Sequence, residues 1–371
     1  MITISLCMIV KNEENVLERC LDTVADLMDE IIIVDTGSTD RTKEIAAKYT
    51  DKIYDFAWIK DFSAARNFSF SKATMEYIYA PDADEILDEE NRERFRVMKE
   101  CLLSEIEMVQ MKYVTENEEN SVMNAKKEYR PKLFKRQRTF TWIDPVHETV
   151  RLNPVVYNSD IEILHKPEHT HQKRDFSIFT SAYKRDGMLS DKLMAMYAKE
   201  LLKLGEPQDF LEAKEIFEQR WMEAPLGDNG KEAACILARN ARYQDMPNEL
   251  FKYALRDMME NPCSEICYEL GEYYKCQKDY DEAIVWYYNA AYETTSIIDI
   301  RTGGDLPLKG LVECYEELMN HIDNDDNIDN AKNSDSKRVC EELLDRYRRE
   351  LLAWKMPEDL DIREENLNKN I

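Results

Sequence analysis

Hydrophobic residues in the first 165 positions gather in short runs that alternate with amphipathic stretches. The runs are mostly apolar and end at polar turn residues, which is typical of buried strands in a parallel sheet. The stretches between them carry apolar residues every three or four positions, as one face of a helix does. The pattern predicts strands at Ile2–Val10, Ile31–Asp35, Lys52–Tyr54 and Tyr77–Ala80, and helices over Glu13–Met28, Arg41–Tyr49, Ser63–Ala73 and Glu89–Leu103.

The alternation of strands and helices stops after Leu103. Strand-like pieces then follow one another without helices between them, at Met108–Val114, Leu133–Arg136, Thr149–Val156 and Ile161–His165. A parallel α/β half followed by mixed strands predicts a Rossmann-like mixed sheet.

From about Gln172 onward the strand pattern is replaced by helix formers and helical spacing of apolar residues. The segment Ser264–Ile297 has the spacing of a tetratricopeptide repeat, in which small residues let two antiparallel helices pack closely. Met194–Pro225 and Asn240–Pro262 keep less of this pattern. The matching residues of the best repeat are Leu270, Gly271, Tyr274, Ala283, Tyr287 and Ala290.

These two patterns predict two domains. Residues 1–171 form the α/β domain, and residues 172–371 form an all-α tetratricopeptide-like domain. Within the second domain, the polar segment 323–336 is expected to be an acidic loop, and Val339–Trp354 a terminal helix.

The composition narrows the possible partners and the compartment. A formal net charge of −25 disfavours nucleic acid, because its phosphates would be repelled. No stretch approaches the roughly 18–20 apolar residues of a membrane helix, and the N-terminus lacks a secretory pattern. Nine cysteines, scattered and odd in number, favour a reducing compartment and core positions over disulfides. We therefore expect a cytoplasmic protein without a transmembrane segment.

Acidic residues follow two of the predicted strands. Asp35 precedes a glycine turn and the start of a helix, and the cluster Asp82-Ala83-Asp84-Glu85 follows the run Tyr77–Ala80. Ligands of open α/β sheets lie at the carboxyl ends of strands, so these carboxylates indicate a nucleotide at one strand end and a metal at the other. An acidic turn before a helix also occurs as a simple N-cap.

Four segments together resemble the GT-A glycosyltransferases of family 2 in their order and spacing. They are Ser5–Glu14 (SLCMIVKNEE), Val34–Asp40 (VDTGSTD), Asp61–Asn67 (DFSAARN) and Asp82–Glu85 (DADE). The resemblance covers roughly the first 170 residues. It is closer still to a bacterial subgroup with a tetratricopeptide-like helical domain, which includes the SunS-type peptide S-glycosyltransferases. That subgroup tends to carry a Val-His-Glu motif, here Val146–Glu148, and a later strand-end histidine, matched by His165.

The resemblance implies a divalent cation at the DADE segment. Asp84 would be the direct ligand, Asp82 would lie nearer the ribose or a metal-bound water, and His165 would complete the shell. The oxygen-rich set suits Mg²⁺ or Mn²⁺, and Mn²⁺ tolerates an imidazole better. Pro81 departs from the usual strand residue before this motif, so the strand is expected to end early.

The resemblance also implies the donor site and the catalytic residues. Asp35 would accept hydrogen bonds from the uridine of a UDP-sugar, Arg66 would reach the nucleotide or its phosphates, and Lys11 is assigned to the same site. For the catalytic base of an inverting transfer, Glu148 is the candidate, with Asp144 as the alternative and His147 beside them. A structural His-Glu pair that closes a loop is an equal alternative.

The predicted function is therefore an inverting, metal-dependent glycosyltransferase that moves a hexose from a UDP-sugar to a peptide or protein. The accepting residue, cysteine, serine or threonine, stays open. One alternative is transfer to a cell-envelope glycan or lipid carrier, and another is a non-catalytic tetratricopeptide scaffold. A homodimer is also compatible with the helical domain, although the sequence holds no direct signal for it.

Overall fold

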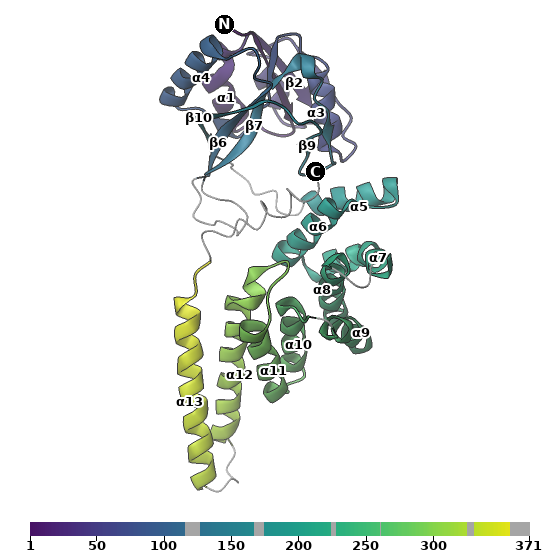
Figure 1. Cartoon of the computed structure of the whole chain (residues 1–371), viewed down its shortest axis with the longest axis vertical. Helices are drawn as coiled ribbons and strands as arrows, with labels where there is room; N and C mark the ends of the chain where they lie inside the picture. Colours follow the sequence, from purple (N-terminus) through teal and green to yellow (C-terminus); the bar gives the residue numbers. More distant parts are fainter. Residues whose placement is uncertain (116–126, 167–173, 224–227, 260, 325–329, 357–371) are drawn as a thin grey trace. The chain divides into compact units, whose positions relative to one another are not determined.

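The structure, a computed structural model, describes residues 1–115, 127–166, 174–223, 228–259, 261–324 and 330–356. It divides into two compact units, Met1–Ile178 and Phe179–Met356. They are the purple-to-blue and the teal-to-yellow parts of the chain in Figure 1. The predicted domain boundary between residues 171 and 172 lies outside the described residues and stays a prediction.

The first unit is built on a mixed sheet of eight strands in the order β3-β2-β1-β4-β7-β6-β10-β5. Strands β3, β2, β1 and β4 are parallel neighbours, whereas β7 is antiparallel to both β4 and β6. This order confirms the predicted parallel half followed by mixed strands. The strands are β1 (Ile4–Val10), β2 (Glu30–Asp35), β3 (Ile53–Asp55), β4 (Tyr77–Tyr79), β5 (Glu85–Ile86), β6 (Met108–Thr115), β7 (Lys127–Lys135) and β10 (Val156–His165), with the separate pair β8 (Trp142–Ile143) and β9 (Thr149–Val150).

Helices cover both faces of this sheet. Alternate side chains of β1 point to opposite faces, so Leu6 and Met8 enter one apolar cluster while Cys7 enters the other. The first cluster packs against α1, α2 and α4, and the second against α3 and the strand β8. These helices are α1 (Leu17–Val24), α2 (Thr42–Ala46), α3 (Phe62–Phe70) and α4 (Glu89–Cys101).

Several strands differ from the predicted ones, and the short strands β5 and β8 were not predicted. β4 ends at Tyr79, as expected from Pro81, although Ala80 N still donates to Lys132 O at 2.9 Å. β7 starts at Lys127 rather than at the predicted Leu133. The prediction missed the first half of the strand because that half is rich in charged residues and lacks an apolar run. The expected strand Thr149–Val156 is wrong: β9 stops at Val150, and Val156 instead begins the long strand β10.

Glu30, at the start of β2, has a buried carboxylate on which both oxygens accept hydrogen bonds. Its side chain is 1% exposed and accepts from Lys52 Nζ at 2.6 Å, from Thr74 N and Oγ1 at 2.9 Å, and from the Ser5 hydroxyl. Burial alone would raise the pKa of Glu30, but these donors lower it from 4.5 to about 2. The charged carboxylate therefore stabilises the folded state.

The pH dependence of this contribution has a defined sign. Because the folded pKa of Glu30 lies below the unfolded one, its contribution is complete above pH 4.5 and is lost as the pH falls toward 2. We expect Glu30→Gln to reduce the free energy of unfolding at pH 7 by on the order of 2 kcal/mol, and the difference to close in acid. Urea unfolding at several pH values checks this, with the exposed Glu44→Gln as the charge-matched control. A gap that is constant with pH would contradict it.

The second unit is helical throughout its described residues. Helix α5 spans the division between the units, and a π segment at Asn289–Glu293 and a 3₁₀ segment at Ile300–Gly303 follow α11. The helices are α5 (Arg174–Asp186), α6 (Asp191–Leu204), α7 (Pro207–Glu223), α8 (Asp228–Tyr243), α9 (Pro247–Met258), α10 (Ser264–Cys276), α11 (Tyr280–Tyr288), α12 (Asp305–Asn324) and α13 (Asn330–Ala353).

The best predicted repeat, Ser264–Ile297, is the helical pair α10 and α11. Leu270 and Gly271 on α10 and Tyr287 on α11 are buried, and a Cβ on Gly271 would lie 2.7 Å from the Tyr287 ring. A glycine is thus needed where the large ring crosses the helix, which is the packing reason given for the spacing. Asn240–Pro262, by contrast, is not one hairpin, since its first residues end α8 and the rest forms α9.

The predicted acidic loop at 323–336 is largely helical. Residues 323–324 belong to α12 and residues 330–336 to α13, while 325–329 lie outside the described residues. Polar composition suggested a loop, but a long helix that packs against a neighbour along part of its length can continue through a polar stretch. The terminal helix at Val339–Trp354 is part of α13. Among the described helices none is both long and apolar enough to cross a bilayer.

Candidate donor and metal site

Sheet direction brings the predicted site residues to one edge. β1, β2 and β4 are parallel, and two antiparallel steps through β7 make β6 and β10 point the same way. The carboxyl ends of β2, β4 and β10 therefore lie at the same edge. Asp35 and His165 are the last residues of β2 and β10, and the DADE segment comes shortly after the end of β4, so residues far apart in the sequence meet at this edge.

Asp84 and His165 form the most direct contact among the predicted metal ligands. His165 Nε2 lies 3.0 Å from Asp84 Oδ2, and both side chains are about one-quarter exposed, at 24% and 26%. Lys166 N also donates to Asp84 O at 3.0 Å, which ties the end of β10 to the DADE segment. The centroid of the His165 ring lies 5.0 Å from that of the Tyr113 ring, and this contact restricts the orientation of the imidazole.

Asp82 belongs to a second set of contacts. Arg66 on α3 donates from Nη2 to Asp82 Oδ1 at 2.9 Å and from Nε to Glu148 Oε1 at 2.5 Å. The Arg66 guanidinium also stacks over the Trp142 ring, 5.1 Å from its centroid. The structure thus brings the predicted nucleotide residue Arg66 together with a predicted metal residue and with the predicted base.

Lys132 and Glu85 complete this set, and neither residue was assigned a role from the sequence pattern. Lys132 Nζ lies 2.6 Å from Glu85 Oε1 and 3.4 Å from Asp82 Oδ2, and the side chains of Lys132 and Glu85 are 6% and 1% exposed. Burial alone would raise the pKa of Asp82, but Lys132 and Arg66 hold it well below its ordinary range. A lysine directly before the apolar Leu133-Phe134 was the available signal, and it was missed because β7 was expected to start one residue later.

The site carries more negative charge than its cations balance. Burial, and after it the charge of Asp84, raises the pKa of Glu13 to about 7. Burial also raises the pKa of Glu85 to about 8, with Asp82 adding to the effect, and its Oε2 is buried without a hydrogen-bond partner. Crowded carboxylates of this kind attract a cation, because a positive ion relieves their mutual repulsion. Glu13, although part of the first motif, had also been given no role.

The donor set fits a divalent metal. Two neighbouring ligands about 2.1 Å from one octahedral ion lie about 3 Å apart, which is the separation of Asp84 Oδ2 and His165 Nε2. Carboxylate oxygens with one imidazole suit Mg²⁺ or Mn²⁺. The side chain of Asp82 is 38% exposed, so its carboxylate can bind a metal ion in addition to Arg66.

Asp35 lies at the same edge but is already hydrogen-bonded to its own turn. Its carboxylate accepts from Gly37 N at 3.1 Å and Ser38 N at 3.0 Å, and Gly37 has a φ of 103°, which glycine adopts readily. The loop after β1 is held beside this turn, since Asn12 Oδ1 accepts from Thr39 N at 2.8 Å. Lys11, in that loop, is exposed. The structure does not bring Lys11 or Asp35 into the contacts around Asp82 and Asp84.

The three predicted catalytic residues lie in the loop between β8 and β9 and divide into two groups. Glu148 is 13% exposed and bound to Arg66, whereas His147 is exposed and Asp144 is half-buried. Asp144 and His147 both have left-handed backbones, with φ of 71° and 51°. Pro145 O accepts from Phe62 N at 2.8 Å, so this loop is attached to the start of α3 and hence to Arg66.

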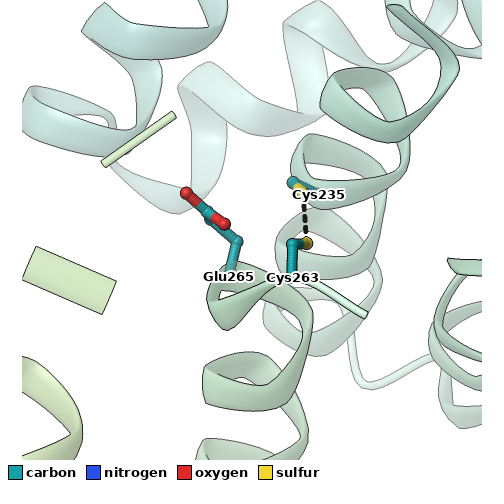
Figure 2. A group of neighbouring side chains, drawn as sticks. All are labelled: Cys235, Cys263 and Glu265. Atoms are coloured by element: carbon teal, nitrogen blue, oxygen red, sulfur yellow. Dashed lines mark hydrogen bonds between the residues drawn. The ribbon is translucent and has the colours of Figure 1, made fainter. Parts of the chain in front are cut away.

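A separate cluster of possible metal ligands lies in the second unit. Cys235 Sγ and Cys263 Sγ are 3.5 Å apart, with Glu265 beside them, and all three residues are buried (Figure 2). The Glu265 carboxylate, however, accepts from the backbone N–H groups of residues 297, 298 and 299. This accounts for its burial without a metal. Cys263 and Cys267 are core residues as expected, whereas Cys276 is exposed.

The comparison with protein families decides the class of the first unit. Residues 5–150 match the model of glycosyl transferase family 2. These residues form a glycosyl transferase family 2 domain. The family 2 domain contains every predicted site residue except His165 and confirms the resemblance drawn from the four motifs.

Individual relatives match shorter stretches. The chain is 49% identical over 87 residues to a TPR repeat-containing protein of Synechococcus elongatus, and 41% identical over 92 residues to the prophage-derived glycosyltransferase SunS of Bacillus subtilis. Each match covers 24% of this chain and 22% of the relative, so the chain spans under a quarter of either protein. An uncharacterized glycosyltransferase of Rickettsia bellii is 25% identical over 224 residues, which is 55% of this chain and 69% of the relative.

Among solved structures, the chain resembles glucosyl-3-phosphoglycerate synthase from Mycobacterium tuberculosis, solved with Mn²⁺ and UDP-glucose. The TM-score is 0.38 at 17% identity, over 51% of this chain and 81% of the other. A match of this size supports no argument about the present chain.

Proposed function

We propose that the protein is an inverting, metal-dependent glycosyltransferase that transfers a hexose from a UDP-sugar to a peptide or protein acceptor. The family 2 domain supports the reaction class. The observation that carries the proposal further is the Asp84–His165 pair at 3.0 Å, beside an excess of carboxylates at the carboxyl edge of the sheet. That arrangement suits a divalent ion and the diphosphate it would neutralise.

In this proposal each group at the edge has a distinct task. Asp84 and His165 would hold the ion, with Asp82 as a further ligand or a partner of the ribose, and the bound ion would supply positive charge for the departing diphosphate. Arg66, fixed by Asp82, Glu148 and the Trp142 ring, presents a positive charge to the nucleotide or its phosphates. The carboxylate of Asp35 keeps unused lone pairs beyond those used in its turn and would accept a hydrogen bond from the uracil base. Lys11 lies on the loop after β1, which is held beside this turn.

The experiment that tests the proposal is the release of UDP from a panel of UDP-hexoses, with Mn²⁺ or Mg²⁺ and without an acceptor. We expect slow hydrolysis of one donor, which EDTA abolishes and added metal restores. No hydrolysis and no binding of UDP by calorimetry would contradict the proposal and favour the non-catalytic scaffold.

Glu148 is proposed as the base that takes the proton of the attacking group. One of its carboxylate oxygens is held by Arg66, which leaves the other to accept a proton. We expect Glu148→Gln to lower the rate of UDP release by roughly 10²–10⁴-fold, while the Kd for UDP changes by less than about threefold. Rapid-quench assays and calorimetry measure the two quantities.

The outcome also separates Glu148 from the alternatives. A comparable loss of UDP binding would mean that Glu148 acts only by positioning Arg66. Unchanged turnover in Glu148→Gln with loss in Asp144→Asn would assign the base to Asp144. Thr141→Ala, at an exposed position just before β8, serves as the control for a change beside the same loop.

The acceptor is the least constrained part of the proposal. Similarity to SunS, a glycosyltransferase, and the helical second unit support a peptide or protein, and the nine free thiols accord with a reducing, cytoplasmic location. Transfer to an envelope glycan or lipid is the alternative. Peptide acceptors that raise UDP release above the hydrolysis rate would favour the first, and lipid-linked acceptors that do so would favour the second. The homodimer stays a prediction.

A further inference from the structure

The second unit contains a polar pocket of about 320 Å³ that has no part in the donor site. Its walls come from four helices and the segment between α11 and α12. The lining residues are Leu202, Arg239, Arg242, Tyr243, Tyr268, Glu272, Asp299, Arg301 and Leu306. Three arginines around one pocket are unexpected in a chain of net charge −25.

Two of these arginines are fixed by one buried carboxylate. Glu269 on α10 is 1% exposed and accepts on one oxygen from Arg239 Nε and on the other from Arg242 Nε at 2.6 Å. The arginine side chains are themselves only 8% and 14% exposed. One negative charge thus holds two buried guanidinium groups by their inner edges.

The outer edge of Arg242 is left with unused donors. Arg239 also donates from Nη1 to Leu202 O at 3.3 Å, but neither Nη of Arg242 has a hydrogen-bond acceptor within the described part of the chain. The Arg242 guanidinium lies 4.7 Å from the centroid of the Tyr243 ring, which limits its movement. The Nη groups of Arg242 are not enclosed by the protein but face the pocket, so an acceptor from outside can replace water there and form a charge-assisted hydrogen bond.

The carboxylates of the pocket already have partners. Glu272 accepts from Lys275 and from the Tyr287 hydroxyl, and Asp299 accepts from Arg301 N at 3.0 Å. Arg301 is paired through Nε and Nη2 with Asp305. The pocket groups that can still form hydrogen bonds are therefore mainly donors. The negative charges of Glu272 and Asp299 would repel a dianion more strongly than they would repel a single carboxylate.

We propose that this pocket binds a carboxylate of a peptide segment, which the outer edge of Arg242 holds in a bidentate manner, with Arg239 and Arg301 beside it. A planar fork of two N–H groups matches a carboxylate. As a way of recruiting the acceptor, the inference rests on the proposed function, but the binding itself does not require catalysis. The carboxylate comes either from an Asp or Glu side chain or from a peptide C-terminus.

Fluorescence anisotropy with three labelled peptides of one Gly/Ser/Ala background tests this on the full chain. The first carries an internal Glu-Glu and an amidated end, the second Gln-Gln and an amidated end, and the third Gln-Gln and a free carboxylate. We expect the first or the third to bind with a Kd below about 1 mM and the second not to bind. Which of the two binds tells a side chain from a C-terminus as the source.

The variant Arg242→Gln should raise the Kd for the acid-bearing peptide by roughly tenfold or more, whereas Arg346→Gln should change this Kd by less than about twofold. Arg346 is the matched control because it lies on α13, outside the pocket, and also pairs with a glutamate and stacks over tyrosines. Circular dichroism checks folding. If Arg242→Gln unfolds, Arg301→Gln, whose side chain is 44% exposed, replaces it, with a smaller expected loss of about threefold because Arg301 lies beside the carboxylate and is paired with Asp305.

Three results would overturn the inference: binding of the Gln-Gln amide as tight as that of the acid-bearing peptides, equal binding by Arg242→Gln, or no binding by any peptide. Displacement by inorganic phosphate at lower concentration than by acetate would overturn the choice of a carboxylate. The assay contains neither donor nor metal. Peptide binding without UDP release would therefore contradict only the proposed function, and UDP release without peptide binding only this inference.

Discussion

Replacement of Asp84 by alanine is expected to lower UDP release from the active donor by at least roughly a hundredfold. Asp84 Oδ2 and His165 Nε2, the two atoms proposed to bind the metal, lie 3.0 Å apart, and Asp84 supplies the negative charge of the pair. Without it the ion binds weakly, and its stabilisation of the leaving diphosphate, worth several kcal/mol, is lost. A coupled assay for UDP at saturating donor and varied Mn²⁺ measures the effect.

The design separates a weaker metal site from a missing one. Raising the Mn²⁺ concentration should recover part of the rate in Asp84→Ala if His165 and Asp82 still bind the ion. Asp160→Ala is the control, since Asp160 lies on β10 with its side chain 82% exposed and pairs with Lys112 at 2.8 Å. Near-wild-type turnover in Asp84→Ala at low metal would remove Asp84 from the metal site.

Replacement of Lys132 by methionine is expected to have the largest effect on stability. It removes the ammonium group 2.6 Å from Glu85, whose side chain is 1% exposed, and 3.4 Å from Asp82. Because burial already raises the pKa of Glu85 to about 8, this carboxyl can take up a proton when its partner is lost, and we expect a cost of about 1–3 kcal/mol. Hydrogen exchange of peptides from β1 and β4 across a urea series measures the loss within the first unit.

The double variant Lys132→Met/Glu85→Gln is the control for this result. Because it removes both charges and keeps the side-chain volumes similar, it should regain most of the lost stability. If the double variant is as unstable as the single one, methionine packs poorly at position 132, and the ion pair is not the cause. Lys112→Met, at a partly exposed ion pair on β6, gives the size of an ordinary change.

The predicted sequence pattern was sufficient for elements whose signal is local. The apolar runs of β1, β2 and β4 and the spacing in α1 and α4 identified these elements, because burial of one or both faces leaves a period that can be read directly. Gly271 opposite Tyr287 was readable for a similar reason, since small and large residues must alternate where two helices touch. β7 and β10 were only partly predicted, because their pairing partners lie far away along the chain.

The sequence by itself was enough to place a glycosyl transferase family 2 domain in the first unit and to nominate candidate residues for its site. Motifs carry that information, because the chemistry demands particular side chains at particular spacings. Only the tertiary structure decided which of them meet: Arg66 with Asp82 and Glu148, Asp84 with His165, and Lys132 with Glu85. It also placed Glu269 between Arg239 and Arg242. Such contacts join residues up to 82 positions apart, and strand order and helix packing set them, while the local sequence pattern does not.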